Sequence, residues 1–85
     1  MDQNITLAEA VADSERETEG QAIVRLRAYA EEHFDGHFTL LKFTTNWRCM
    51  LGTVSPQRPA IQRMPCGHSL SEAVSRAIRH AEKRR

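Results

Sequence analysis

The sequence predicts an α+β fold in which helices pack on one face of a small antiparallel sheet. Residues 14–34 and 70–81 carry apolar side chains at helical spacing, and residues 37–54 are rich in β-branched and aromatic residues. The length suits one small domain, 1–85, with a thin core. The side chains expected to supply most of that core are Phe38, Leu40, Leu41, Phe43, Trp47, Leu51, Leu26, Tyr29, Val74 and Ile78.

The N-terminal part contains two capping-box patterns, in which a hydroxyl and a later carboxylate satisfy free amides at a helix start. Thr6–Glu9 predicts a short helix through Ala12, and Ser14–Glu17 predicts a longer helix over about 14–34. Glycine weakens a helix interior, so two helices that meet near Gly20 are the alternative.

After a turn at Asp35-Gly36, residues 37–45 and 47–54 are predicted to form a β-hairpin. A two-residue turn at Thr45-Asn46 would pair Leu40 with Leu51 and Leu41 with Met50. A three-residue turn would set Lys42 opposite Arg48. It would also give the better apolar face, made of Leu41, Phe43, Trp47, Cys49 and Leu51. Both registers stay open.

The C-terminal part is predicted to be a loop followed by a helix. Residues 55–68 hold three prolines and Gly67, and a short edge strand over Ala60–Met64 is an option because proline is tolerated at sheet edges. Ser69-Leu70-Ser71-Glu72 is a third capping box and opens a helix to about residue 83. The apolar face of this helix is Leu70, Ala73, Val74, Ala77, Ile78 and Ala81.

Little in the sequence points to catalysis or to a bound metal. It has no Gly-rich phosphate loop, no nucleophile motif and no tightly spaced metal ligands, so we expect no enzyme, no metal and no cofactor. Cys49 is predicted to be a small buried hydrophobe and Cys66 the more exposed thiol, both reduced in the cytosol. No apolar run approaches the ~18 residues of a membrane span, and Met1–Asn4 is unlike a signal peptide. We therefore expect a cytoplasmic protein.

The two parts of the chain carry opposite charge. Residues 1–35 hold nine acids and three bases, a net of −6, while residues 36–85 hold two acids and nine bases, a net of +7. Such asymmetry predicts a charged partner or a second copy of the chain, and a homodimer would also bury apolar surface. The acidic row, a candidate partner-binding set, is Glu9, Asp13, Glu15, Glu17 and Glu19. The basic set, a candidate for a protein partner or nucleic acid, is Arg58, Arg63, Arg76, Arg79, Lys83, Arg84 and Arg85.

Several resemblances to known families accompany these patterns. The run Gly67-His68-Ser69-Leu70-Ser71-Glu72-Ala73 resembles the strand–Gly–helix segment of HicB-type antitoxin domains. The block from Phe38 to Arg48 looks like short proteins of bacteria and their phages, and the chain is similar in size and charge to the anti-CRISPR inhibitors. The helix–strands–helix order is similar to the double-stranded-RNA-binding domain. That family has its basic cluster at the start of the last helix, where this sequence has Ser69–Ala73.

Together these observations predict a non-enzymatic protein-binding module. The resemblance to phage and mobile-element inhibitors implies an anti-CRISPR-like protein that occupies a charged surface of a nucleic-acid-handling complex. The acidic row would face a basic groove, or the basic set would face an acidic patch. The alternatives are direct nucleic-acid binding through the basic C-terminal helix, a HicB-like antitoxin, and self-assembly driven by the opposite charges.

Overall fold

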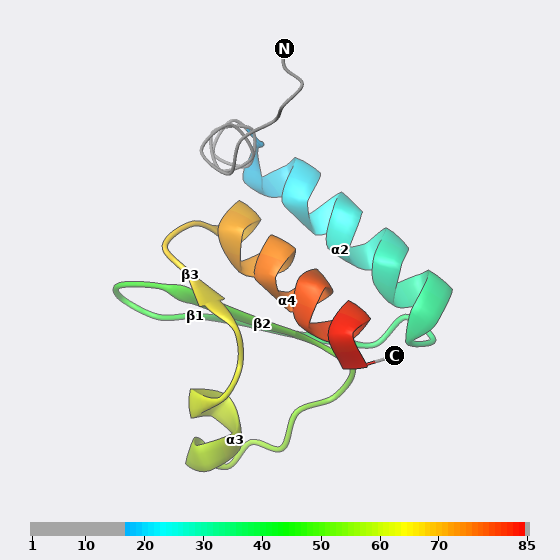
Figure 1. Ribbon diagram of the computed structural model, residues 1–85. Coiled ribbons are helices and arrows are strands. Elements are labelled where there is room, and N and C mark those ends of the chain that lie inside the picture. Colours follow the sequence, from blue (N-terminus) through cyan, green and yellow to red (C-terminus); the bar gives the residue numbers. More distant parts are fainter. Residues whose placement is uncertain (1–16, 85) are drawn as a thin grey trace.

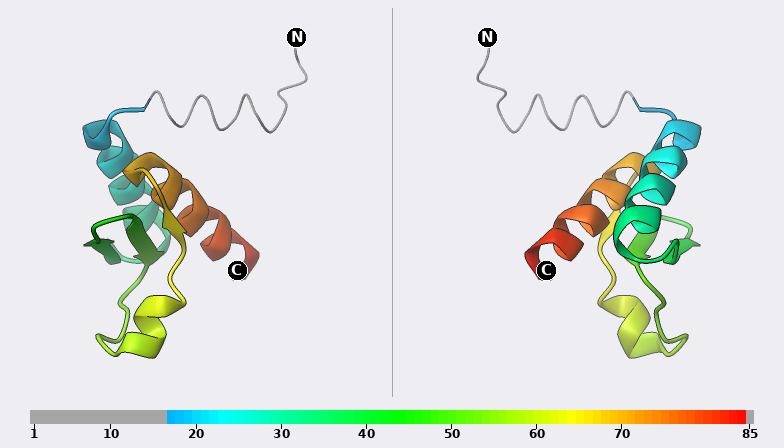
Figure 2. Two further views of the ribbon diagram at one scale, coloured as in Figure 1. Left: turned by 90° about the vertical axis from the view of Figure 1, so that its left-hand side faces the viewer. Right: turned by 90° about the vertical axis from the view of Figure 1, so that its right-hand side faces the viewer.

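The computed structural model describes residues 17–84 and has the predicted α+β fold (Figure 1). A three-stranded antiparallel sheet has the strand order β1-β2-β3, and the two long helices lie on the same face of it (Figure 2). The elements are α2 (Glu19–His33), β1 (Phe38–Lys42), β2 (Trp47–Leu51), α3 (Arg58–Gln62), β3 (Cys66–Gly67) and α4 (Leu70–Arg84). None of the described helices is long and apolar enough to cross a membrane.

Helix α2 begins later than predicted. Its N-cap is Thr18, whose Oγ1 accepts a hydrogen bond from the backbone N–H of Gln21, while the Gln21 side chain accepts one from the Thr18 N–H. This reciprocal pair is a capping box that uses Gln in place of Glu. The prediction that Ser14–Glu17 opens this helix was wrong, because Glu17 and Thr18 are not helical. The predicted helix through Ala12 lies outside the described residues.

Helix α2 is followed by the predicted turn at Asp35-Gly36. Asp35 and Gly36 both take positive φ values, 57° and 84°, and the Gly36 N–H donates to the Ala30 carbonyl at 2.9 Å. The Ala30 carbonyl also accepts from the Phe34 N–H at 2.7 Å, so this left-handed exit adds a second donor to the same oxygen and turns the chain into β1.

The β-hairpin is present, but neither predicted register is correct. Its strands pair from Phe38↔Leu51 to Lys42↔Trp47, around a two-residue Thr44-Thr45 turn that lies one position earlier than predicted. This register keeps Lys42 away from Arg48 and places its Nζ 5.4 Å from the centre of the Trp47 ring. The side chains that face the helices are Phe38, Leu40, Trp47, Cys49 and Leu51.

Two predicted core residues are consequently misplaced. Leu41 and Phe43 alternate with the core-facing side chains and therefore point to the opposite face of the sheet. Phe43 is 41% exposed, and the Arg48 guanidinium lies 5.9 Å from its ring.

The segment after the hairpin contains the helix α3 in place of the edge strand that was considered for it. The prediction for Ala60–Met64 was wrong, because α3 covers most of that segment and has Pro59 in its first turn, where the missing N–H costs nothing. The third strand lies further on, at β3, and pairs with Trp47 and Arg48.

Helix α4 starts as predicted, at a Ser69 cap. The Ser69 Oγ accepts from the Glu72 N–H at 3.1 Å, and the Glu72 carboxylate accepts from the His68 N–H at 2.7 Å. Strand β3 runs directly into this cap at very close range. A Cβ added to Gly67 would lie 2.6 Å from the Ala73 nitrogen, so no other residue fits there without movement.

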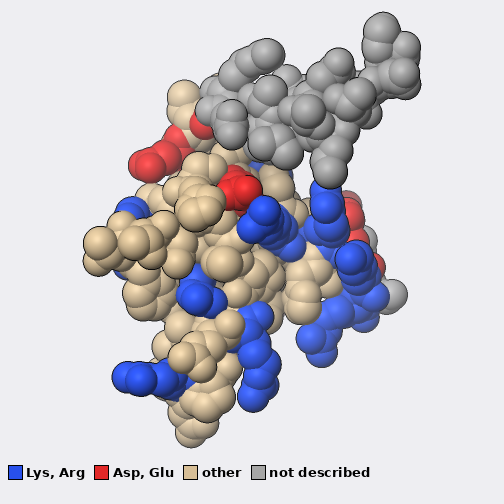
Figure 3. All heavy atoms as spheres, turned by 60° about the vertical axis from the view of Figure 1, so that its left-hand side comes forward, with Lys and Arg blue, Asp and Glu red and all other residues tan. Residues whose placement is uncertain are grey.

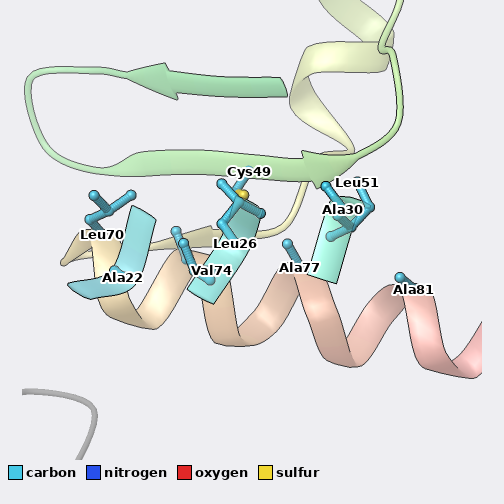
Figure 4. Packing of buried hydrophobic residues seen from close by; sticks show 10 residues of the cluster. Ala22, Leu26, Ala30, Cys49, Leu51, Leu70, Val74, Ala77 and Ala81 are labelled. Atoms are coloured by element: carbon cyan, nitrogen blue, oxygen red, sulfur yellow. The ribbon is translucent and has the colours of Figure 1, made fainter. Parts of the chain in front are cut away.

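The core lies where α2 and α4 meet β2 (Figure 4). Leu26, Val74 and Cys49 are its largest fully buried side chains, as expected for all three. Alanines from both helices surround them and allow the two helices to approach closely: Ala22, Ala30, Ala73, Ala77 and Ala81. Tyr29, Phe38, Leu40, Trp47 and Ile78, expected in the core, are partly buried and pack against it.

Candidate functional site

Only part of the predicted acidic row lies within the described residues. Glu9, Asp13 and Glu15 lie outside them. Glu19 is exposed in the first turn of α2, where the helix dipole favours a carboxylate. Glu17 is 18% exposed and is already bound within the chain.

Glu17 belongs to a hydrogen-bonded cluster between the start of α2 and the start of α4. Its two carboxylate oxygens accept from Arg25 Nη2 at 2.8 Å and Arg25 Nε at 3.0 Å, and one of them also accepts from Ser71 Oγ at 2.6 Å. Arg25 in turn donates to Ser75 Oγ at 3.0 Å. We call these four residues the Glu17 cluster.

The electrostatics of the Glu17 cluster favour a charged carboxylate. The hydrogen bond from Arg25 is the main cause that lowers the pKa of Glu17 from its usual 4.5. The Ser71 hydroxyl adds to this, and partial burial opposes it. The cluster therefore acts as a tie between two helices that are far apart in sequence. That Glu17 also binds a partner stays a prediction. Its carboxylate already accepts hydrogen bonds from Arg25 and Ser71 within the chain.

Most of the predicted basic set is described, and most of its described members form no ion pair among residues 17–84. Arg76 is the exception, since it donates to the Cys66 carbonyl at 2.8 Å and pairs with Glu72 at 3.0 Å. Arg85 lies outside the described residues. Within residues 17–84, no acid lies at ion-pair distance from the other members, which are Arg58, Arg63, Arg79, Lys83 and Arg84.

Part of this basic set gathers around one hollow. An open hollow of about 740 Å³ lies between α3, the end of α4 and the segment after β2; we call it the α3–α4 hollow. Its polar side includes Arg63, His80 and Arg84, so the structure brings together bases from two separate segments of the set. Its apolar lining consists of Phe34, Met50, Leu51, Val54, Ala60 and Ala81.

The charge around this hollow is predominantly positive. Arg63 and Arg84 are exposed, whereas Leu51 and Ala81 in the same lining are buried. Figure 3 shows one face of the molecule on which several Lys and Arg side chains lie with few acidic ones between them. Bases set beside apolar surface suit a partner that offers both carboxylates and apolar side chains.

Arg48 holds α3 in place and was missed as a site residue. Its Nη1 lies 3.1–3.4 Å from the carbonyl oxygens of Ile61, Gln62 and Met64, at the C-terminal end of α3 where a cation is favoured. Arg58 lines a second hollow, of about 560 Å³, together with Arg48 and Phe43. No local sequence signal could have predicted the role of Arg48, because its contacts with α3 depend on the hairpin register and on α3 being helical.

The cysteines and histidines form no evident centre for chemistry. Cys49 is fully buried, and burial raises the pKa of its thiol to about 12, so it is the small buried hydrophobe that was predicted. Cys66 is partly exposed in β3. No group of three metal-ligating side chains comes together among residues 17–84.

Comparisons with family models, with curated proteins and with solved structures gave no match for this chain. Its function therefore has to be inferred from its own residues.

Proposed function

We propose that this chain is a non-enzymatic protein-binding module that engages an acidic, partly apolar surface of a protein partner through the α3–α4 hollow. The observation that supports this is the composition of the hollow. Exposed Arg63 and Arg84 stand beside buried apolar side chains, and no described acid neutralises them.

The apolar lining favours a protein over a nucleic acid as the partner. A phosphate backbone is polar along its whole length and gains nothing from contact with Met50, Val54 or Ala60. A protein segment can insert an apolar side chain there and set carboxylates against the two arginines. Arginine is well suited to this because its planar guanidinium can bind a carboxylate through two hydrogen bonds.

The setting we propose is inhibition of a nucleic-acid-handling complex, as by a phage or mobile-element protein of the anti-CRISPR kind. Such a protein needs no catalytic site, only a charged surface that competes for another charged surface. The support is the small size, the charge asymmetry and the basic hollow. The acidic row, of which Glu19 is exposed on α2, is a second surface that could serve the same role. A cytoplasmic location and a HicB-like antitoxin role also remain proposals.

The test is site-specific crosslinking in bacterial cells. A photo-crosslinking amino acid at Val54, in the lining of the hollow, is expected to capture a discrete partner, whereas the same residue at Val24, exposed on α2, is not. The charge reversals R63E and R84E should each abolish capture. The matched control is R27E, a reversal at an exposed position of α2. Equal capture from both positions, or capture that survives R63E and R84E, would overturn the proposal.

Direct nucleic-acid binding is the second candidate, because Arg58, Arg79 and Lys83 are also exposed and have no described acidic partner. A gel shift with single- and double-stranded DNA and RNA at about 50 and 200 mM salt tests it, since phosphate contacts weaken steeply with salt. Salt-sensitive binding that is lost in R79E/K83E would replace the protein-partner proposal. No shift at low salt would count against this candidate.

A further inference from the structure

The two edges of the sheet are protected very differently. The β3 edge is only two residues long and follows Pro65, and the carbonyl of Cys66 on it is bound by Arg76 at 2.8 Å. The β1 edge is five residues long and contains no proline and no bulge. Short strands, prolines and bound edge groups are the usual protections against pairing with another chain, and β1 has none of these three.

The backbone groups that β1 leaves unpaired can be assigned from the register. Phe43 and His37 are both hydrogen-bonded to the β2 side, through Phe43 N–H to Asn46 O and Gly52 N–H to His37 O. Antiparallel ladders alternate, so the N–H and C=O groups of Phe38, Leu40 and Lys42 point away from β2. Within residues 17–84, no hydrogen bond to these outward groups is found, and the β1–β2 turn protrudes beyond the long helices (Figure 1).

We propose that two copies of this chain pair antiparallel through their β1 edges, so that the dimer has one continuous six-stranded sheet. This inference is independent of the α3–α4 hollow. A second copy is the favoured occupant because of charge. Exposed residues of opposite sign flank β1: Asp35 lies three residues before the strand, and Lys42 is its last residue.

Charge complementarity also selects the register of the pairing. In a two-fold arrangement centred on Thr39, the outward groups of Phe38 meet those of Leu40 in the second copy, and Lys42 lies opposite Gly36 of the second copy. The Lys42 ammonium is then within side-chain reach of Asp35 of the second copy, and the same contact forms twice. Asp35 has no ion pair within the described residues, so it is available for this contact.

The first experiment is a charge-swap cycle measured by sedimentation equilibrium over a wide range of protein concentration. K42E and D35K should each raise the dimer Kd about tenfold, because two ion pairs are replaced by two repulsive contacts. The double variant K42E/D35K should return close to the wild-type Kd. The matched control is K83E, the same reversal at an exposed position of α4, and it should leave the Kd unchanged.

Folding of the variants is controlled separately. Asp35 has a φ of +57°, which lysine adopts less readily than aspartate or asparagine, so D35N removes the charge with less strain than D35K. D35N should raise the Kd by less than D35K while keeping the wild-type urea midpoint at a concentration where both proteins are monomeric.

Hydrogen exchange provides a readout specific to the edge. The amides of Phe38, Leu40 and Lys42 should exchange rapidly in dilute protein and become protected as the dimer forms, while those of Thr39 and Leu41 stay protected throughout. A wild-type chain that stays monomeric would overturn the proposal. A dimer whose Kd is unchanged by K42E and by D35K would overturn it too. Protection of the edge amides only in the presence of another protein would assign the edge to a different partner and would also overturn it.

Discussion

Replacing Glu17 by Gln should destabilise the fold by about 1 kcal/mol at neutral pH. The wild-type carboxylate accepts two hydrogen bonds from Arg25 and one from Ser71 Oγ, and bonds to charged groups contribute about 1.5–3 kcal/mol when well buried. Arg25 is 36% exposed, so solvent screening reduces that figure. Glutamine keeps one acceptor oxygen and therefore loses only part of the rest. For a domain of this size the melting temperature should fall by about 4–8 °C.

The pH dependence of this loss has a defined sign. The pKa of Glu17 in the folded chain is lowered below 4.5, chiefly by the hydrogen bond from Arg25. A carboxyl whose pKa is lowered by folding stabilises the native state above its unfolded pKa and loses that contribution as the pH falls through its folded pKa. The stability difference between wild type and E17Q should therefore be full at pH 7 and shrink well below pH 4.5.

Urea unfolding of both proteins at neutral and acidic pH measures this difference directly. Glu19→Gln is the matched control, because Glu19 is exposed and contributes only a helix-dipole effect of a few tenths of a kcal/mol. If E17Q were no less stable than E19Q at pH 7, or if its deficit persisted unchanged at acidic pH, the structural role of the Glu17 cluster would be refuted. The same comparison shows that Glu19 suits a partner-binding test, since a change at Glu17 would mix binding with folding.

Three further predictions concern single residues. Gly67→Ala should cost about 1–3 kcal/mol in urea unfolding, because its Cβ would lie 2.6 Å from the Ala73 nitrogen; a neutral effect would mean that β3 can move away from α4. A thiol reagent should label Cys66 in the native chain and reach Cys49 only in denaturant, since Cys49 is fully buried with its pKa raised to about 12; native labelling of both would contradict this. Arg48→Ala should free the α3 carbonyls and speed tryptic cleavage after Arg63, while an unchanged rate would show that Arg48 does not anchor α3.

Features set by local chemistry could be predicted from the sequence. The end of α2 follows from Asp35-Gly36, which can take the positive φ values that the turn requires. The start of α4 follows from Ser69 and Glu72, which satisfy the backbone amides at the helix start. Each signal lies within a few residues of its effect, so no tertiary information was needed.

Features set by tertiary contacts could not be predicted. The hairpin turn lies at Thr44-Thr45, not at the stronger turn former Asn46, because this register places Phe38, Leu40 and Trp47 against the helices. A shift by one residue reverses every side chain, which is why Leu41 and Phe43 were wrongly assigned to the core. Predicting a core around aromatics also missed the alanine-lined contact of α2 with α4.

Only part of the candidate site could be predicted from the sequence, because the rest depends on tertiary contacts. The basic residues of the loop and of the C-terminal helix could be named from the sequence, but neither the helix α3 within that loop nor the apolar lining of the hollow was predicted. Met50 and Val54 belong to the end of the hairpin and the segment after it. They line the hollow together with Arg63 and Arg84, and Arg48 holds the C-terminal end of α3, next to Arg63, through its backbone carbonyls.

The two proposed surfaces share no residue, so substitutions in one surface should affect partner binding differently from substitutions in the other. The β1 edge uses residues 35–42, whereas the α3–α4 hollow is lined by Phe34, by residues between Met50 and Arg63, and by the end of α4. A dimer through β1 would therefore carry two accessible hollows, and two linked hollows bind a partner with repeated sites more tightly than one. K42E would then lower apparent affinity for such a partner while leaving each hollow intact, and R63E would lower affinity in monomer and dimer alike. A partner with a single site would respond to R63E alone.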